Sequence, residues 1–532
     1  MSEKKRPNII IFNPDEMRWD SMGHMGNPAA YTPNLDHFAE EEAVSFSHAY
    51  CQNPVCVPSR CSFTTGLYPH VRGHRTMGYL LHEDETSLFK ELKEAGYYVW
   101  MNSRNDLVAG QIHGLAAAHA DEIYYYDWQK QQKQWASMQD HGYHYAHYMG
   151  VTDVEHGNDS DDLEAAIERI LHPVSDQPLC LFLGLNNPHP PYVVEEKYYD
   201  RIDKKKLPER IKKEETSGKS RIMEKIREYS GMDDFPEELW EDMRAVYLAQ
   251  CTMIDDMFGR LCEALKTAGI YDECAIFVLS DHGDFAGDYD LPEKAQNTFE
   301  DCLVRVPLLV KPPKGDSVDA GVTDSIAELV DFYATVMDYA QVSPTHDHFG
   351  ISLRPAIEDR KEIIRKYAFC EGGRMEVEEQ CDEFHSEGPH GAEKTSCYWA
   401  RMMAQCDSLA HEKGTMISDG HYKYVERPSG NNEFYLLDED MGERINRYEE
   451  FRHSDQVSLM KDELLKWYQT TCDIVPRKYD RRFTEERIWS IVEGMCPKEK
   501  EAEVREAIRN GATIMEAAQC CMGLRKDGAG KE

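Results

Sequence analysis

Short apolar runs alternate with segments of helical spacing along the chain, and this alternation limits the fold more than any other feature. The runs are β-branched or aromatic and lack polar alternation, which is typical of strands buried on both faces. They occupy residues 8–12, 97–101, 179–185, 275–280 and 306–310. Residues 241–266 place apolar side chains on one helical face. Strands that alternate with helices predict an α/β fold, in which a large and mostly parallel sheet is sandwiched by helices.

The pattern changes towards the end of the chain, which at 532 residues is long enough for more than one domain. After residue 365 the apolar runs are shorter, more polar and separated by turns, which predicts a smaller antiparallel sheet. We therefore expect a main α/β domain in residues 1–365, a smaller C-terminal α+β subdomain in residues 366–480 and a helical tail in residues 481–532. The stretch 201–235, rich in Lys, Glu and Arg, is predicted to be an exposed excursion.

The composition excludes several classes of partner. The chain carries 60 Lys and Arg against 97 Asp and Glu, a net charge of -37. Nucleic acids and anionic membranes need a positive surface, so we expect neither as a partner. No apolar stretch of the sequence reaches the length of a membrane span. The 16 cysteines show no regular framework, which favours reduced thiols and a cytoplasmic location.

Polar and titratable residues follow four of the expected strands. Asp15 and Glu16 follow the first, residues 103–106 the second, residues 187–190 the third and residues 281–284 the fourth. The carboxyl ends of the strands in an open α/β sheet form the ligand crevice, so we expect these side chains to lie close together. Each segment alone could be a helix cap or a turn, but their joint position at one sheet edge favours a functional site.

The segment "NPVCVPSRCSFTTG" holds a cysteine in a stiff turn. Pro54 and Pro58 fix φ on either side of Cys56. Residues 59–65 can continue as a short helix that ends at Gly66. The alternative, a buried structural thiol, does not explain why the turn is so restricted.

Two binding chemistries are available at this edge of the sheet. A divalent cation could be bound by carboxylate oxygens and one imidazole, from Asp15, Glu16, Asp281 and His282. A tetrahedral oxyanion could be held by three cations, Arg60, Arg104 and Lys294. A metal beside such cations suits sulfuryl or phosphoryl transfer. His189 could then protonate the leaving group.

These residues stand in motifs that resemble those of the type I, formylglycine-dependent sulfatases of the alkaline-phosphatase-like superfamily. "CVPSR" followed by "CSFTTGLYPH" is similar to the family signature, and "PNIIIFNPDEMRWD" to its first strand and metal motif. "NNPHPPY" resembles the central histidine motif, and "LSDHGDFAGDYDLPEK" the second metal motif with the active-site lysine. With "HYKYVERPSGNNEFYLLDEDMGERIN" as the C-terminal strand pair, the resemblance covers nearly the whole chain. It implies that residues 1–365 form the catalytic domain.

The resemblance also implies a mechanism. A dedicated maturation enzyme oxidises the cysteine, here Cys56, to formylglycine, which hydrates to a geminal diol. One hydroxyl attacks sulfur and releases the alcohol, and the second expels sulfate. Arg60 would orient the diol and Lys294 would hold the sulfate. One divalent metal would be bound by Asp15, Glu16, Cys56, Asp281 and His282.

The sequence departs from the commonest family pattern in three places. Residues 103–106 read Ser-Arg-Asn-Asp where many members have Gly-Lys-x-His. Arg104 can replace the lysine as an oxyanion clamp. Asp106 cannot act as a cationic histidine, so we expect it to orient a group or bind substrate. His189 is then the expected general acid. Glu16 replaces a second aspartate. His282 stands where many calcium-dependent members have asparagine, so we expect Ca²⁺ but leave Mn²⁺ or another transition metal open.

Three functions stay open on the sequence. The first is hydrolysis of a sulfate monoester of a small sugar, aryl or alkyl alcohol. The second is hydrolysis of a phosphonate monoester or phosphodiester on the same scaffold, and the third is anion binding by an inactive relative. Substrate contacts are expected from His70 and His74, which could equally cap turns, and from a long polar segment at 372–401. The candidates in that segment are Arg374, His385 and His390. The helical tail could form a homo-oligomer contact.

Overall fold

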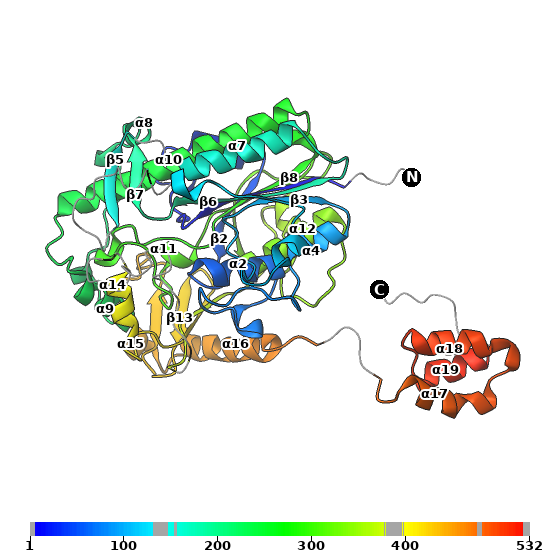
Figure 1. Ribbon diagram of the computed structural model, residues 1–532. Coiled ribbons are helices and arrows are strands. Elements are labelled where there is room, and N and C mark those ends of the chain that lie inside the picture. Colours follow the sequence, from blue (N-terminus) through cyan, green and yellow to red (C-terminus); the bar gives the residue numbers. More distant parts are fainter. Residues whose placement is uncertain are drawn as a thin grey trace. The chain divides into compact units, whose positions relative to one another are not determined.

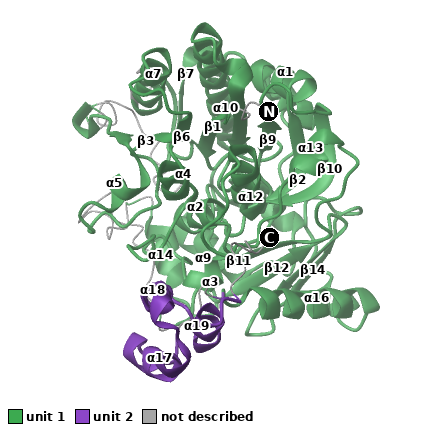
Figure 2. Ribbon diagram, turned by 90° about the vertical axis from the view of Figure 1, so that its right-hand side faces the viewer, with its two compact units in different colours: residues 1–474 green, residues 475–532 purple. Residues whose placement is uncertain are grey.

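The computed structural model describes residues 6–130, 133, 147–153, 157–376, 378, 396, 398–475 and 481–524. The chain forms two compact units, residues 1–474 and 475–532, which are coloured separately in Figure 2. No helix among the described residues is long and apolar enough to cross a membrane.

An eight-stranded sheet forms the centre of the first unit. In spatial order its strands are β10 (Gly321–Glu328), β2 (Val44–Tyr50), β9 (Leu308–Lys311), β8 (Cys274–Leu279), β1 (Asn8–Asp15), β6 (Leu179–Pro188), β3 (Tyr98–Asn102) and β4 (Glu122–Tyr124). All neighbours pair in parallel except β9, which is antiparallel to both β2 and β8. The predicted mostly parallel sheet is therefore confirmed, and the five predicted strands all belong to it.

Helices cover both faces of this sheet (Figure 1). On one face lie α1 (Pro33–Glu41), α7 (Gly157–Leu171) and α10 (Glu237–Thr267), and on the other lie α2 (Cys56–Thr65), α4 (Leu88–Glu94) and α12 (Leu329–Ala340). Successive residues of β1 enter different cores: Ile9 and Ile11 join the cluster with α2, α4 and α12, whereas Ile10 and Phe12 join the cluster with α1, α7 and α10. A strand covered on both sides needs apolar residues at every position, which explains the unbroken apolar runs.

A second, four-stranded antiparallel sheet follows in the first unit. Its strands are β11 (Ala368–Gly372), β12 (Gly414–Ser418), β13 (Tyr422–Glu426) and β14 (Glu433–Leu436). Helix α16 (Asp455–Thr471) packs on it, and Trp467 stacks on Phe369 with ring centroids 4.8 Å apart. The predicted smaller antiparallel sheet is confirmed. The boundaries at residues 365 and 480 stay predictions.

The second unit is the predicted helical tail. It contains α17 (Glu485–Val492), α18 (Glu501–Arg509) and α19 (Ile514–Cys521), which bury an apolar cluster of their own. Thr513 and Glu516 form a reciprocal capping box at the start of α19. The unit therefore has both a core and a helix-start signal encoded in its own short sequence.

Shorter elements complete the first unit. Its remaining helices are α3 (Pro69–Arg72), α5 (Leu115–His119), α8 (Glu196–Tyr199), α9 (Arg221–Ser230), α11 (Asp301–Val304), α13 (Arg354–Glu358), α14 (Trp399–Gln405) and α15 (Tyr448–Phe451), and β5 (Tyr148–Thr152) pairs with β7 (Tyr192–Glu195). The prediction that residues 201–235 form an exposed excursion holds only in part: residues 203–206 and 213–215 are exposed, but other parts of the stretch are buried. Helix α9 places Ile222, Met223 and Ile226 in the core, and Lys219 is only 9% exposed.

Candidate active site

The ends of β1 and β8, the start of α2 and the loop after β3 meet at one point. Arg60 of α2 joins two of them: its Nη2 lies 2.9 Å from Asp15 Oδ2, and its Nε lies 2.8 Å from Asp281 Oδ2. Arg104, from the loop after β3, places its Nη2 2.6 Å from the same Asp15 oxygen. The structure thus brings together residues that the sequence separates widely. Arg60, Asp15 and Asp281 have no exposed surface, so their charges are compensated by each other.

Cys56 is the first residue of α2 and is 1% exposed. Its Sγ lies 3.1 Å from His282 Nε2 and 3.5 Å from Asp15 Oδ1. Burial raises the pKa of this thiol well above its ordinary value, and the Asp15 charge adds to the effect. Both effects favour the neutral thiol, whereas a reactive cysteine nucleophile needs a lowered pKa.

Glycine is required at two positions that shape this site. Gly66 ends α2 with φ of 69°, and a Cβ there would lie 2.9 Å from atoms of Tyr333 and His348. Gly184 of β6 allows close approach of the Arg104 carbonyl, with which a Cβ would collide. That carbonyl accepts a hydrogen bond from Arg60 Nη1 at 2.7 Å. The loop carrying Arg104 is therefore fixed from two sides.

Four side chains could hold a metal ion. Ligand atoms of Asp15, Cys56, Asp281 and His282 all lie within 4.8 Å of one another. The His282 Nδ1 lies 2.9 Å from Gly283 O, which directs Nε2 towards the other three donors. Burial lowers the pKa of His282, which favours the neutral imidazole that ligates metals.

Glu16 adds a further donor to this set. Its Oε1 is buried without a hydrogen-bond partner among the residues that the structure describes, and its φ of 67° is rare for a residue with a side chain. Burial raises the pKa of Glu16 well above its ordinary value despite Lys294, so the site favours an added positive charge. The buried oxygen-rich donor set fits a divalent cation.

Lys294 and His189 lie on the other side of Glu16. The Lys294 Nζ is 2.7 Å from Glu16 Oε2, and His189 Nε2 is 3.5 Å from the same oxygen. The His189 Nδ1 lies 2.7 Å from Pro190 O, which orients the ring. Burial and the charge of Lys294 lower the pKa of His189 well below its ordinary value. Asp15, Glu16 and His189 form a second group of close ligand atoms.

The altered motif after β3 gives Asp106 a different position. Arg104 Nη1 lies 3.3 Å from Asp106 Oδ2, and Asp106 has a φ of 47°. Asp106 belongs to neither group of close metal-ligand atoms among the described residues. This placement supports an orienting role on Arg104 over coordination of a metal.

The candidate substrate residues are held by the protein. His70 pairs its Nδ1 with Glu371 Oε1 at 2.7 Å and its Nε2 with Thr471 O at 3.0 Å. His74 pairs with Tyr79 O at 2.8 Å and Glu85 Oε1 at 2.9 Å. Both ring nitrogens are engaged in each case. His74 holds a local turn, as the alternative proposed, whereas His70 links α3 to β11 and α16. Arg374 Nη1 and Nη2 donate to backbone carbonyls, of Glu378 and Gln405. His385 and His390 lie outside the described residues.

Sequence reasoning missed Tyr192 of β7. Its hydroxyl lies 2.9 and 3.0 Å from the two Asp284 carboxylate oxygens, and burial raises the pKa of Asp284 to about 6. The available signal was the segment "HPPY", which places this tyrosine three residues after His189 on a stiff stretch of chain.

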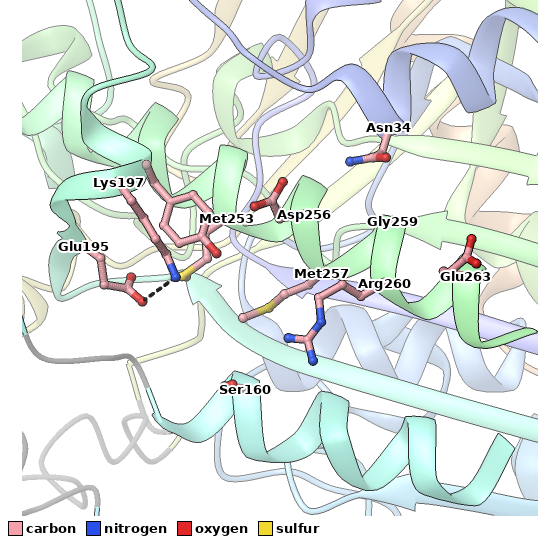
Figure 3. Close-up of a pocket in the computed structure, with 11 residues that line it drawn as sticks. Asn34, Ser160, Glu195, Lys197, Met253, Asp256, Met257, Gly259, Arg260 and Glu263 are labelled. Atoms are coloured by element: carbon pink, nitrogen blue, oxygen red, sulfur yellow. Dashed lines mark ion pairs between the residues drawn. The ribbon is translucent and has the colours of Figure 1, made fainter. Parts of the chain in front are cut away.

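A surface pocket of about 400 Å³ lies elsewhere, between α7, α8 and α10 (Figure 3). Most of its charges are paired with each other or with neighbours: Lys197 lies 3.9 Å from Glu195, and Asp256 lies 3.2 Å from Arg201. Such exposed pairs contribute little to stability, and they occupy most of the charged groups that could bind a ligand. The strand-end site, not this pocket, concentrates the chemistry.

A mostly parallel sheet with a candidate metal-ligand set, a thiol and buried cations at its strand ends is consistent with the alkaline-phosphatase-like fold. A solved phosphonate monoester hydrolase from Silicibacter pomeroyi shares this fold with a TM-score of 0.68 at 20% identity, over 88% of this chain and 96% of that chain. A family model described as Sulfatase matches residues 7–342. The chain belongs to the sulfatase family and is a sulfuric ester hydrolase.

Curated relatives agree with this assignment. An arylsulfatase of Clostridium perfringens is 26% identical over 418 residues, which cover 68% of this chain and 80% of the relative. A choline-sulfatase of Rhizobium meliloti is 27% identical over 393 residues, which cover 68% of this chain and 74% of the relative.

Proposed function

We propose that the protein hydrolyses a sulfate monoester of a small sugar, aryl or alkyl alcohol, using formylglycine made from Cys56 and one divalent metal. The observation that carries the proposal is the position of the Cys56 thiol. It lies at the start of α2, 3.1 Å from His282 Nε2 and 3.5 Å from Asp15 Oδ1, among the metal-binding side chains. A neutral buried thiol is a poor nucleophile, but a residue modified at this position would face both the metal donors and the cations.

The metal would be held by Asp15, Asp281, His282 and the side chain at position 56, with Glu16 as a further oxygen donor. When bound, it supplies positive charge that favours the ionised form of an oxygen nucleophile and neutralises the developing charge. We propose Ca²⁺, in keeping with the family resemblance, while the imidazole of His282 would also suit Mn²⁺. The formylglycine, once hydrated, supplies that oxygen nucleophile.

Other residues of the chain would orient the group at position 56, bind the sulfate and donate the proton. Arg60 is held between Asp15 and Asp281 and would orient the group at position 56. Lys294 and Arg104 would bind the sulfate oxygens, because each has a charged nitrogen at the edge of the donor set. His189 would donate a proton from Nε2 to the leaving alcohol oxygen, because its Nδ1–H is held by Pro190 O. Its lowered pKa requires that the negative charge of a bound sulfate ester first favour the protonated ring.

A comparison of matched aryl substrates tests the proposal. The maturation-competent enzyme should hydrolyse an aryl sulfate with a higher kcat/KM than the corresponding aryl phosphonate or phosphodiester. The reverse order would establish the alternative, a phosphonate monoester or phosphodiester hydrolase. If enzyme shown to carry the aldehyde turns over neither class of aryl substrate, nor any alkyl or sugar sulfate, the result would indicate the inactive relative.

A cytoplasmic location and a maturation partner belong to the same proposal. The described cysteines are all free thiols, which supports a reducing compartment. The aldehyde requires a formylglycine-generating enzyme as a partner, and the helical second unit is our proposed contact for a homo-oligomer.

A further inference from the structure

The loop from Asp284 to Glu293 joins two parts of the active site. Asp281 and His282 precede it, and Lys294 follows it directly. Several of its non-glycine residues have positive φ, including Ala286 at 45° and Glu293 at 57°. L residues rarely adopt this conformation. Because Glu293 immediately precedes Lys294, its backbone sets the direction in which the lysine leaves the loop.

The start of this loop is fixed to the protein core. Gly283 N donates to Leu303 O at 2.7 Å, and Asp284 N donates to Cys302 O at 3.0 Å. A Cβ at Gly283 would collide with the Cys302 carbonyl. The end of the loop has a different attachment: Glu293 O accepts from Phe285 N at 2.9 Å, a bond within the loop itself. The position of Glu293 therefore depends on contacts from outside the loop.

Tyr192 makes such a contact and links both ends. Its side chain has no exposed surface. Its hydroxyl lies 2.9 and 3.0 Å from the two carboxylate oxygens of Asp284, and it accepts a hydrogen bond from Glu293 N at 2.7 Å. The Tyr192 hydroxyl thus donates a hydrogen bond to Asp284, the first residue of the loop, and accepts one from Glu293, the last. From the other side, Glu293 forms an ion pair with Arg401 of α14.

We propose that Tyr192 is a positioning residue, whose hydroxyl holds Lys294 in a fixed place relative to Asp281 and His282. Without the hydroxyl, the buried Glu293 N–H loses its acceptor and the Asp284 carboxylate loses a donor, and both are costly to leave unpaired. The strained Glu293 backbone can then relax, and Lys294 moves with it. This inference rests on the proposed function in one respect, namely that Lys294 binds the sulfate group.

The test is Tyr192→Phe, which keeps the ring and removes the hydroxyl. Loss of one hydrogen bond to a charged group predicts a rise of about tenfold in the inhibition constant of inorganic sulfate. KM for an aryl sulfate should rise by a similar factor, with a smaller change in kcat. The loss should be equal for a nitrophenyl sulfate and an alkyl sulfate, because the variant leaves the proton donor in place.

Tyr435→Phe is the matched control. Tyr435 is 2% exposed, donates to Glu433 Oε2 at 2.7 Å and accepts from Lys219 Nζ at 2.9 Å, so it makes the same kinds of bond away from the site. It should lower the melting temperature without changing the sulfate inhibition constant. If Tyr192→Phe does not fold, Asp284→Asn carries the test, with a smaller rise expected in the same constant.

The Lys294→Ala variant distinguishes failure of the positioning role of Tyr192 from failure of the proposed function. If this variant weakens sulfate inhibition while Tyr192→Phe lowers only the melting temperature, the positioning role is wrong and the proposed function stands. If wild-type enzyme hydrolyses no sulfate ester and Lys294→Ala leaves sulfate binding unchanged, the proposed function itself is wrong.

Discussion

The first unit buries two clusters of charged side chains that match in composition and differ in what surrounds them. The active-site cluster consists of Asp15, Glu16, Arg60, Arg104, Asp281 and Lys294. The junction cluster consists of Lys219, Glu300, Asp301, Arg305, Lys423 and Glu443. Each contains three cations and three carboxylates.

The charged side chains of the junction cluster form ion pairs with one another. Lys423 Nζ lies 2.5 Å from Asp301 and 2.6 Å from Glu443, and Lys219 lies 2.8 Å from Glu300. The pairs join α11, β13 and the loops near residues 219 and 443, which are far apart in the sequence. A buried ion pair of this kind fixes which segments meet and is weak evidence for function.

The active-site cluster also contains close groups of metal-ligand atoms, and among the described residues the junction cluster forms none. A thiol and two imidazoles, from Cys56, His189 and His282, lie within reach of its carboxylates. Positive φ at non-glycine residues does not separate the two clusters, because Glu16 and Asp106 have it in the active-site cluster and Glu443, at 48°, has it in the junction cluster. The close grouping of chemically different donor atoms, and not buried charge or strained backbone alone, therefore distinguishes the functional site. Substitutions in the active-site cluster should affect turnover, and substitutions in the junction cluster should affect stability.

The largest effect is expected at the thiol. Cys56→Ala should reduce kcat by roughly 10⁴-fold or more, because it removes the atom that is converted to the nucleophile. Cys56→Ser should be nearly as inactive, since serine is not the residue that is oxidised here. Steady-state kinetics with a thermal melt checks that the fold is kept. Substantial turnover by the serine variant would instead indicate a simple hydroxyl nucleophile.

Removal of a metal ligand should come next. Asp281→Ala should lose the bound metal and lower kcat/KM by roughly 10³-fold, because the metal charge favours the ionised nucleophile. A chelator should do the same to the wild type. Asp284→Ala is the comparison variant and should retain metal in elemental analysis, with a smaller loss of rate. Equal damage by both substitutions would show that the ligands are wrongly assigned.

The junction cluster should respond in the opposite sense. Lys423→Met removes the cation that pairs with both Glu443 and Asp301, and leaves Arg305 as the remaining cation beside Asp301. It should lower the free energy of unfolding by about 3–5 kcal/mol. The kcat per folded molecule should not change. Lys461→Met removes an exposed lysine that lies 3.6 Å from Glu426, and it should cost less than about 1 kcal/mol. A kinetic defect in folded Lys423→Met would mean that the two clusters are coupled.

The smallest effect depends on the substrate. His189→Ala should slow an alkyl sulfate by roughly 10²-fold and a nitrophenyl sulfate only mildly, because a phenolate leaves without a proton. Asp106→Ala should raise KM or lower the rate without this dependence. An equal loss on both substrates would show that His189 binds sulfate. A steep dependence for Asp106→Ala would move the proton donor to the loop after β3.

Much of the fold could be predicted because the central strands are buried on both faces. Residues 8–12 and 275–280 could be assigned to strands from their own residues, because unbroken β-branched runs are typical of strands buried on both faces. Strands β2 and β10, "VSFSHAY" and "GVTDSIAE", mix polar and apolar residues and were not predicted. Their place in the sheet depends on pairing with each other. The antiparallel direction of β9 likewise depends on how the chain connects this strand to its neighbours, and the residues of β9 do not indicate it.

The same limit applies to the site. The stiff turn at Cys56 and the Asp281–His282 pair are local motifs, so their positions followed from the sequence. The contact of Tyr192 with Asp284 and Glu293 joins distant segments through one hydroxyl, which no local pattern reveals. Lys219 lies in a highly charged stretch and was predicted to be exposed, but its partner Glu300 allows it to be buried. Long-range charge pairing cannot be read from composition.

The central claim is that Cys56 is the precursor of the nucleophile. The most direct measurement is the mass of the tryptic peptide that ends at Arg60, taken from active enzyme purified from its native host. The account predicts an aldehyde in place of the Cys56 thiol, at an occupancy that scales with kcat between preparations. Active enzyme in which Cys56 remains an unmodified thiol would contradict it.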